Sequence, residues 1–146
     1  MSVLRVTDLK KVYGSGHLAV AAISGVELSV QAGELVALLG PSGSGKSTLL
    51  NCISLILEPS AGQVEIGGKT VFADGETLVR VRPFRRQNIG FIFQGSFLIP
   101  FLSALDNVRL VLELNHATRK EAGKKASELL EQLDIAHRAG SFPGQL

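Results

Sequence analysis

The chain has 146 residues, of which 45% are hydrophobic and 19% are charged, and its formal net charge is +2. This composition excludes intrinsic disorder, which requires low hydrophobicity and high net charge, and the length is sufficient for one domain with a core. The small net charge does not indicate nucleic-acid binding. The single cysteine, Cys52, excludes an internal disulfide and favours a reducing compartment.

The first 40 residues are predicted to form strands. Val3–Val6 is typical of a short strand, and the segment from His17 to Val30 is typical of one or two strands of an antiparallel meander. A turn at residues 31–34 precedes Leu35–Leu39, a continuous apolar run that predicts a strand buried on both faces of a parallel sheet. This run is far shorter than the roughly 20 residues of a membrane span. We therefore expect a soluble chain that reaches a membrane only through a partner.

A helix and two more strands are predicted in the middle of the chain. The helix is expected from Gly45 to about Leu57, where Glu58-Pro59 ends it. A short strand is expected at residues 64–66, before the turn signal Gly67-Gly68. Ile89–Phe93 is a second apolar run and predicts a second buried strand.

The last third of the sequence changes to a helical pattern. Ser103 with an acid three residues later marks a helix start, and Thr118 with Glu121 forms a full capping box. The helix that this box opens has one apolar face, formed by Ala122, Ala126, Leu129, Leu130 and Leu133. The order is mostly strands, then strand–loop–helix, then mostly helices, which predicts an α/β fold.

Residues 40–48 carry the strongest chemical signal, because GPSGSGKST satisfies the pattern G-x-x-x-x-G-K-[ST]. Its glycines allow backbone angles in which successive N–H groups cradle phosphate oxygens, and the following helix adds its positive N-terminal end. Lys46 supplies a positive charge near the terminal phosphates, Ser47 can ligate Mg²⁺, and Thr48 can support the phosphate shell. The predicted nucleotide-binding residues here are Gly40, Pro41, Ser42, Gly43, Ser44, Gly45, Lys46, Ser47 and Thr48.

The alternative for this segment is a Gly-Ser loop with an incidental lysine. The four fixed positions match by chance on the order of once in 10⁵ starting points, which disfavours that alternative. The context also favours the phosphate loop, because a predicted buried strand precedes it and a predicted helix follows it.

With this loop, the chain resembles the ATP-binding subunit of ABC transporters, nearest to the bacterial lipoprotein-release and macrolide-export ATPases. Lys11–Gly14 resembles the aromatic loop of that family, and residues 57–62 resemble the turn that leaves the phosphate-loop helix. Residues 89–94 resemble the strand that enters the Q-loop, and residues 97–100 with 104–108 resemble the start of the helical subdomain.

The resemblance implies a P-loop NTPase fold of the ABC type. It implies an N-terminal antiparallel β part and P-loop core in residues 1–95 and a partial helical subdomain in residues 96–146. It also implies ATP and Mg²⁺ as cofactors, a membrane-spanning permease subunit as one partner, and a second ATP-binding subunit that completes a nucleotide sandwich. The implied location is cytoplasmic, on the inner face of the cell membrane through the permease, and no nucleic-acid partner is expected.

Two site residues outside the phosphate loop follow from the resemblance. It implies that Tyr13 stacks on adenine, a contact of about 1–3 kcal/mol per base, whereas the residue by itself favours a hydrophobic position at a strand edge. It implies that Gln94 reaches Mg²⁺ and the attacking water, and links the nucleotide to the membrane partner through the mobile loop that follows. Otherwise Gln94 is an exposed polar residue at a strand end. The implied catalytic residues are Lys46 and Gln94, and the implied metal ligands are Ser47 and Gln94.

The segment Ser141–Leu146 resembles the stretch that leads into the SGGQ signature of the family. The signature, the Walker B strand, the catalytic glutamate and the switch histidine are not found, and Glu58, Glu113 and Asp134 are interpreted as helix-surface acids. We therefore expect an incomplete ABC-type domain, truncated before the signature, without ATP turnover of its own.

Three functions remain open. The first is an ATPase subunit that couples ATP binding and hydrolysis to export or extraction of a substrate. The second is a non-catalytic nucleotide-binding module. The third is a P-loop kinase, which is weaker because no second catalytic carboxylate or lid-like arginine run is found.

The remaining polar and reactive residues are interpreted as structural. Cys52 is expected to pack in the core. The three histidines lack metal-ligand spacing and are expected at the surface or in turns: His17, His116 and His137. Four arginines are expected on a solvated helix face, with a partner contact as the alternative: Arg80, Arg82, Arg85 and Arg86.

Overall fold

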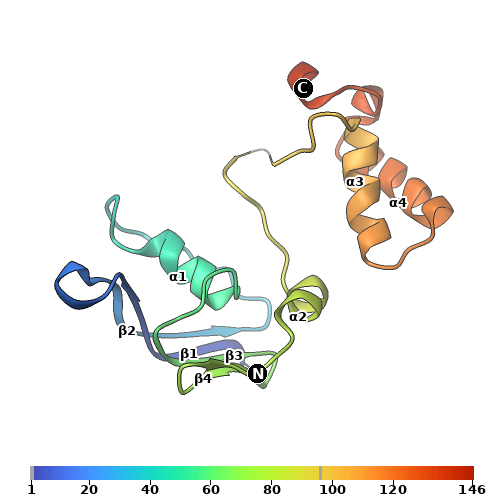
Figure 1. Cartoon of the computed structure of the whole chain (residues 1–146). Helices are drawn as coiled ribbons and strands as arrows, with labels where there is room; N and C mark the ends of the chain where they lie inside the picture. Colours follow the sequence, from blue (N-terminus) through green and yellow to red (C-terminus); the bar gives the residue numbers. More distant parts are fainter. Residues whose placement is uncertain (1, 96) are drawn as a thin grey trace. The chain divides into compact units, whose positions relative to one another are not determined.

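The structure is a computed structural model that describes residues 2–95 and 97–146. The chain divides into two compact units, residues 1–90 and residues 91–146, which are described separately (Figure 1). The predicted functional division at residues 95 and 96 stays a prediction. The first unit contains β1 (Ser2–Tyr13), β2 (Val20–Gln31), α1 (Lys46–Ile53), β3 (Ala61–Ile66), β4 (Lys69–Ala73), β5 (Glu76–Thr77) and α2 (Val81–Asn88), with a short 3-10 turn at Gly16–Leu18.

The strands of the first unit form one five-stranded sheet in the order β2-β1-β3-β4-β5, and every neighbouring pair is antiparallel. The predicted antiparallel meander and the short strand at residues 64–66 are confirmed. β1 is longer than the predicted Val3–Val6. Its register shifts between Val6 and Leu9, where Asp8 has a φ of 45°, and this bulge lets the strand bend and continue to Tyr13.

The core of the first unit lies between one face of this sheet and α1 (Figure 1). Cys52 of α1 is fully buried there, so its predicted packing role is confirmed, and this burial raises the pKa of its thiol. Apolar burial of this kind is the main favourable term in folding. The buried residues are Val6, Leu9, Ile23, Leu49, Cys52, Leu55, Val64, Val71 and Phe72.

The predicted strand at Leu35–Leu39 is wrong. Residues 33–40 of the structure form an irregular segment in which Leu35 is 98% exposed and Leu39 is 90% exposed. Leu38 alone of this run packs against the core. A strand needs a neighbour that accepts and donates ladder hydrogen bonds, and none of the five described strands pairs with this run.

The predicted strand at Ile89–Phe93 is wrong for the same reason. α2 ends at Asn88, and the residues that follow have no strand partner among the described residues. In the second unit, Ile92 is fully exposed, and the rings of Phe91 and Phe93 stack with their centroids 5.4 Å apart. The helix predicted from Gly45 to about Leu57 exists but is shorter, since α1 ends at Ile53.

The arginine-rich segment forms α2, a helix with no buried residue. Arg80, Arg82 and Arg86 are exposed, whereas Arg85 is half-buried and its Nη1 donates to the carbonyl of Leu55 at 3.3 Å. The predicted solvated helix face is therefore confirmed for Arg82 and Arg86. Arg80 precedes α2, and Arg85 is bonded to Leu55, just after α1.

The second unit contains two packed helices, α3 (Ala104–Leu114) and α4 (Arg119–Gln132), and short 3-10 turns at Ala136–Arg138 and Pro143–Gln145 (Figure 1). Both predicted helix starts are confirmed: Ser103 Oγ accepts from the Asp106 amide, and Thr118 with Glu121 forms the capping box. The buried residues are Ala104, Asn107, Ala122, Ala126 and Leu130.

The predicted apolar face of α4 is confirmed in its first three turns and wrong at its end. Leu133 is exposed because the helix has already ended at Gln132.

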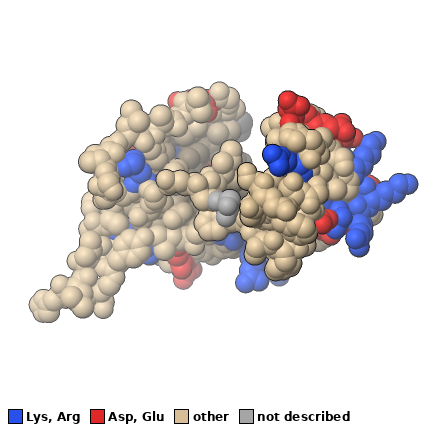
Figure 2. Space-filling model, turned by 90° about the horizontal axis from the view of Figure 1, so that it is seen from above, with Lys and Arg blue, Asp and Glu red and all other residues tan. Residues whose placement is uncertain are grey.

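Uncharged surface dominates the face seen in Figure 2, and charges of both signs lie on the helical unit. No helix in the described part of the chain has both the length and the apolar character needed to cross a membrane.

Candidate functional site

The strongest candidate site is the loop of residues 40–48, which follows the irregular segment after β2 and enters α1. The loop contains a turn in which the Ser44 amide donates to the Pro41 carbonyl at 3.3 Å. α1 begins at Lys46, after the cap residue Gly45, and its first helical hydrogen bond runs from the Leu49 amide to the Gly45 carbonyl at 2.8 Å. The loop thus wraps the N-terminus of a helix whose other end is packed in the core, and such a terminus attracts anions.

Three glycines of the loop have backbone angles that other residues avoid. The φ angles are 152° at Gly40, 81° at Gly43 and 85° at Gly45. Gly45 is required for a second reason, because a Cβ there would lie only 2.4 Å from the carbonyl oxygen of Ala22 in β2. The backbone angles that the motif predicts are therefore present, and Gly45 also allows close contact between the loop and the sheet.

The ammonium group of Lys46 is held over the loop by main-chain oxygens. Its Nζ donates to the carbonyl of Gly40 at 2.9 Å and to that of Pro41 at 2.7 Å, and it lies 3.3 Å from Ser44 Oγ. These three partners are neutral, so none of them is a counter-ion for the ammonium. A phosphate oxygen would be a stronger partner than a carbonyl, because its negative charge adds a Coulomb attraction to the ammonium that a neutral carbonyl lacks.

A hollow of about 240 Å³ lies against the loop. Ser47 is exposed there, and Thr48 is half-buried. Hydroxyl oxygen and phosphate oxygen are hard ligands of the kind that Mg²⁺ takes together with water, so the loop fits a magnesium ion that is bound mainly through nucleotide phosphates. The described residues contain no cluster of three or more His, Cys, Asp or Glu that would hold a metal alone. The hollow is lined by Ala22, Ser42, Gly43, Ser44, Gly45, Lys46, Ser47 and Thr48.

Tyr13 lies at the end of β1, paired with Val20 of β2, and its side chain is 44% exposed. Lys11 Nζ stands 5.4 Å from the centroid of the ring and donates to the carbonyl of Glu58 at 2.8 Å. The ring is therefore at a strand end, in contact with a cation, and partly open to solvent. Stacking on adenine stays a prediction.

Gln94 is exposed in an irregular segment of the second unit, so its relation to the phosphate loop also stays a prediction.

Three acids were predicted to lie on helix surfaces: Glu58, Glu113 and Asp134. Of these three, only Glu113 lies on a helix. Glu58 lies after α1 and its Oε1 accepts from Thr77 Oγ1 at 3.1 Å, and Asp134 lies after α4 with a φ of 58°. Their interpretation as helix-surface acids is thus wrong for two of the three, and none of them lines the hollow.

Sequence reasoning missed two residues that shape these regions. The first is Ala22, whose carbonyl faces Gly45. No local signal could have identified it, because the contact joins residues more than 20 positions apart. The second is Asn107, a buried polar residue in the first turn of α3. The sequence could have indicated it, because it is a polar residue on an otherwise apolar helix face.

A phosphate loop of this sequence, leading into a helix that packs on a sheet, defines the P-loop class of nucleotide-binding proteins. Within that class, the chain belongs to the ABC transporter family, whose family model matches residues 23–146. The predicted fold class is confirmed by this match and by the solved structures below.

Curated relatives match the chain over nearly its whole length. It is 42% identical over 145 residues to the lipoprotein-releasing system ATP-binding protein LolD of Geobacter metallireducens, which covers 99% of this chain and 64% of that protein. It is 43% identical over 143 residues to the LolD protein of Bordetella pertussis, which covers 98% of this chain and 61% of that protein. The chain therefore spans less than two thirds of the length of these relatives.

A solved structure supports the same fold. The ATP-binding cassette MJ0796, in a dimeric post-hydrolysis state bound to ADP and Pi, superposes with a TM-score of 0.84 at 35% sequence identity. The match covers 98% of this chain and 62% of the solved chain.

Proposed function

We propose that the chain binds Mg·ATP through residues 40–48, as the nucleotide-binding part of an ABC transporter ATPase. The observation that carries this proposal is the position of Lys46: its charged group stands over a loop with three left-handed glycines at the N-terminus of α1. Phosphate oxygens would replace the carbonyl partners of Lys46 and receive backbone N–H groups of the loop. Ser47 would contribute its hydroxyl to Mg²⁺, which neutralises phosphate charge.

The proposal also assigns nucleotide-binding roles to Tyr13 and Gln94, as the family resemblance implies. The partly exposed ring of Tyr13 has the stacking surface that an adenine base needs. Gln94 is exposed and can present its amide to a metal-bound water. Both assignments depend on the family resemblance more than on contacts within the chain.

At the level of the whole protein, we propose ATP hydrolysis coupled to extraction or export of a substrate at a membrane. Relatives named as lipoprotein-releasing ATP-binding proteins support extraction of a lipid-linked substrate. The partners would be a membrane-spanning permease, which would hold the chain at the inner face of the cell membrane, and a second ATP-binding subunit. The dimeric state of the MJ0796 cassette supports the second partner.

We propose that these 146 residues alone bind the nucleotide without appreciable turnover. Phosphoryl transfer requires a positioned water and charge stabilisation around the γ-phosphate. Lys46 provides one such charge, but none of the described residues that line the hollow beside it is acidic.

Isothermal titration calorimetry of the chain with Mg·ATP tests the binding proposal. Lys46→Ala should remove most of the binding, because Lys46 is the one cation among the described residues that line the hollow. Lys124→Ala on α4 is the matched control, since it removes the same charge from an exposed helix position and should leave the affinity unchanged. Equal affinity of the parent and Lys46→Ala would contradict the proposal.

A further inference from the structure

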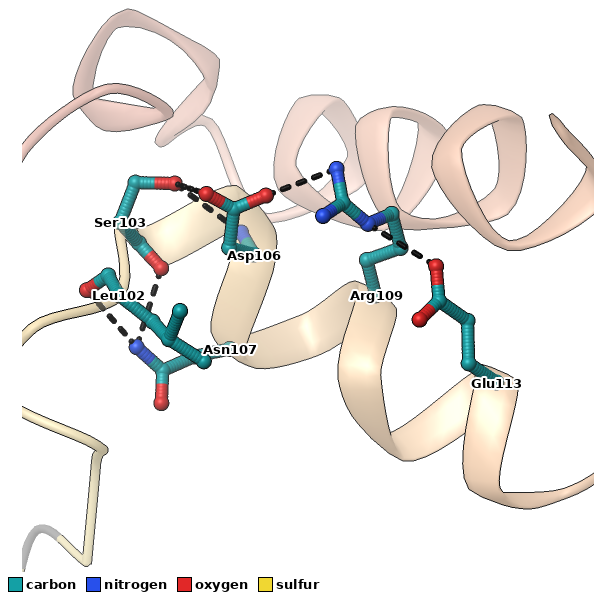
Figure 3. Close-up of polar contacts among 6 residues, drawn as sticks. All are labelled: Leu102, Ser103, Asp106, Asn107, Arg109 and Glu113. Atoms are coloured by element: carbon teal, nitrogen blue, oxygen red, sulfur yellow. Dashed lines mark hydrogen bonds and ion pairs between the residues drawn. The ribbon is translucent and has the colours of Figure 1, made fainter. Parts of the chain in front are cut away.

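The side chain of Asn107 is bound entirely to the backbone of the loop that precedes α3. Its Oδ1 accepts from the Ile99 amide at 2.7 Å. Its Nδ2 lies within hydrogen-bond distance of three carbonyl oxygens, at 3.2 Å from Ile99, 3.0 Å from Leu102 and 3.0 Å from Ser103. Figure 3 shows the amide pointing back from α3 to Leu102 and Ser103. Two amide hydrogens are thus shared among three oxygens.

These bonds matter because the loop has few of its own. Within residues 99–103, one backbone bond is found in the described structure, from the Leu102 amide to the Ile99 carbonyl at 3.1 Å. Asn107 is only 9% exposed, so its amide is shielded from water. Removing it would leave the Ile99 amide and the Leu102 carbonyl without these partners, whereas the Ile99 and Ser103 carbonyls would keep their backbone donors. The loop would then lose its direct bond from the Ile99 amide to α3.

The first turn of α3 binds a second segment of the chain. The first amides of a helix have no partner within the helix. Here the Ala104 amide donates to the Ser141 carbonyl at 2.8 Å, and the Leu105 amide donates to the Ala139 carbonyl at 3.0 Å. The start of α3 therefore joins the loop 99–103 to residues 139–141.

Ionic contacts beside this junction contribute less. Asp106 pairs with Arg109 at 2.8 Å, and Arg109 Nε lies 3.1 Å from Glu113 Oε1 without hydrogen-bond geometry (Figure 3). Partly exposed ion pairs of this kind contribute little to stability. Ser103 Oγ donates to Asp106 at 2.8 Å and caps the helix, but it does not reach the Ile99 end of the loop. Asn107 is the side chain that does.

We propose that Asn107 is a positioning residue that fixes Ile99–Ser103 to α3, so that the chain from Ile99 onward moves with α3 as one body. A displacement of the segment near Gln94 would then reach α3 and residues 139–141 together, because the loop between them does not deform. This reading of the movement rests on the proposed function, in which Gln94 responds to the nucleotide. The attachment of residues 99–103 to α3 does not depend on the proposed function.

Backbone hydrogen exchange of the nucleotide-free chain, measured residue by residue by NMR, tests the proposal. The Ile99 amide is the reporter, because its acceptor is Asn107 Oδ1. In Asn107→Leu, which has a similar shape and no polar atoms, Ile99 should exchange about tenfold faster or more, whereas the buried turns of α4 at Ala126 and Leu130 should change less than about twofold.

The matched control is Asn115→Leu, the same substitution at the other end of α3. The side-chain amide of Asn115 is exposed and donates one hydrogen bond, to the Val111 carbonyl at 3.2 Å. Ile99 exchange should stay at the parent rate in this variant. An unchanged Ile99 rate in Asn107→Leu would overturn the proposal, because the loop would then be held by other contacts.

A second variant separates positioning from general support of the helix pair. In Asn107→Asp, a neutral carboxyl can accept from Ile99 and donate to a carbonyl, whereas a carboxylate faces carbonyl oxygens and repels them. The protection factor of Ile99 should therefore approach the parent value at about pH 4 and fall at about pH 7. Two results together would overturn the proposal. In the first, Asn107→Leu speeds amide exchange throughout α3 and α4 alike. In the second, the Ile99 protection factor of Asn107→Asp shows no such pH dependence relative to the parent. Because no nucleotide is present, the result is independent of ATP binding.

Discussion

Gly45→Ala is the substitution for which the structure predicts the largest local effect in the phosphate loop. Gly45 has a φ of 85°, and an added Cβ would lie 2.4 Å from the carbonyl oxygen of Ala22. Gly43 has nearly the same φ, 81°, but an added Cβ there meets no atom within 4 Å. The two alanine variants therefore share the backbone penalty and differ only in the steric clash.

The magnitudes follow from these two terms. A left-handed conformation costs an alanine about 1–2 kcal/mol, and the lower entropy of the unfolded alanine chain offsets about 0.4–1 kcal/mol of that. Gly43→Ala should thus destabilise the first unit by about 1 kcal/mol. In Gly45→Ala the loop or β2 must also shift, and overpacking of this kind costs about 1–3 kcal/mol, so the total is about 2–4 kcal/mol.

Thermal unfolding followed by circular dichroism measures the difference. One kcal/mol corresponds to about 4–8 °C in Tm for a unit of this size, so Gly45→Ala should melt several degrees below Gly43→Ala. Mg·ATP binding to Gly45→Ala should also be lost, since the shift disturbs the N-terminus of α1. Equal Tm values for the two variants would refute the argument that contact with Ala22 requires a glycine at position 45.

Three further predictions concern turnover, pH and stability. The rate at which the chain releases phosphate from ATP should be no higher than the rate of the Lys46→Ala variant. A steady rate that Lys46→Ala abolishes would contradict this, because it would show that these residues contain a catalytic acid. The Thr118 side chain and then the Thr118 backbone amide lower the pKa of Glu121 below its usual 4.5. The capping box should therefore stabilise α4 above that pH and lose this contribution as the pH falls through the lowered pKa, and amide exchange in Glu121→Gln should lack this dependence. Urea unfolding should give a free energy of unfolding below about 5 kcal/mol, because apolar side chains of Leu35–Leu39 are exposed. A monomer that unfolds in one cooperative transition with a higher free energy would contradict this expectation.

The sequence by itself determined the features that depend on neighbouring residues. The phosphate loop is encoded by the spacing of its glycines and Lys46, because φ preferences and helix N-terminal charge act within one turn. The Ser103 and Thr118 caps were predictable for the same reason, since each side chain binds an amide three residues away. The antiparallel start of the sheet was predictable from alternating apolar residues and turn signals.

The tertiary structure alone decided which apolar runs become strands and which distant groups meet. Leu35–Leu39 has the composition of a buried strand, yet it forms none, because strand formation depends on a neighbouring strand and not on the run itself. The contact of Gly45 with Ala22 and the bonds of Asn107 to Ile99 likewise depend on how the chain turns back on itself. Local propensity does not determine these contacts, because they result from packing between residues that only the folded chain brings together.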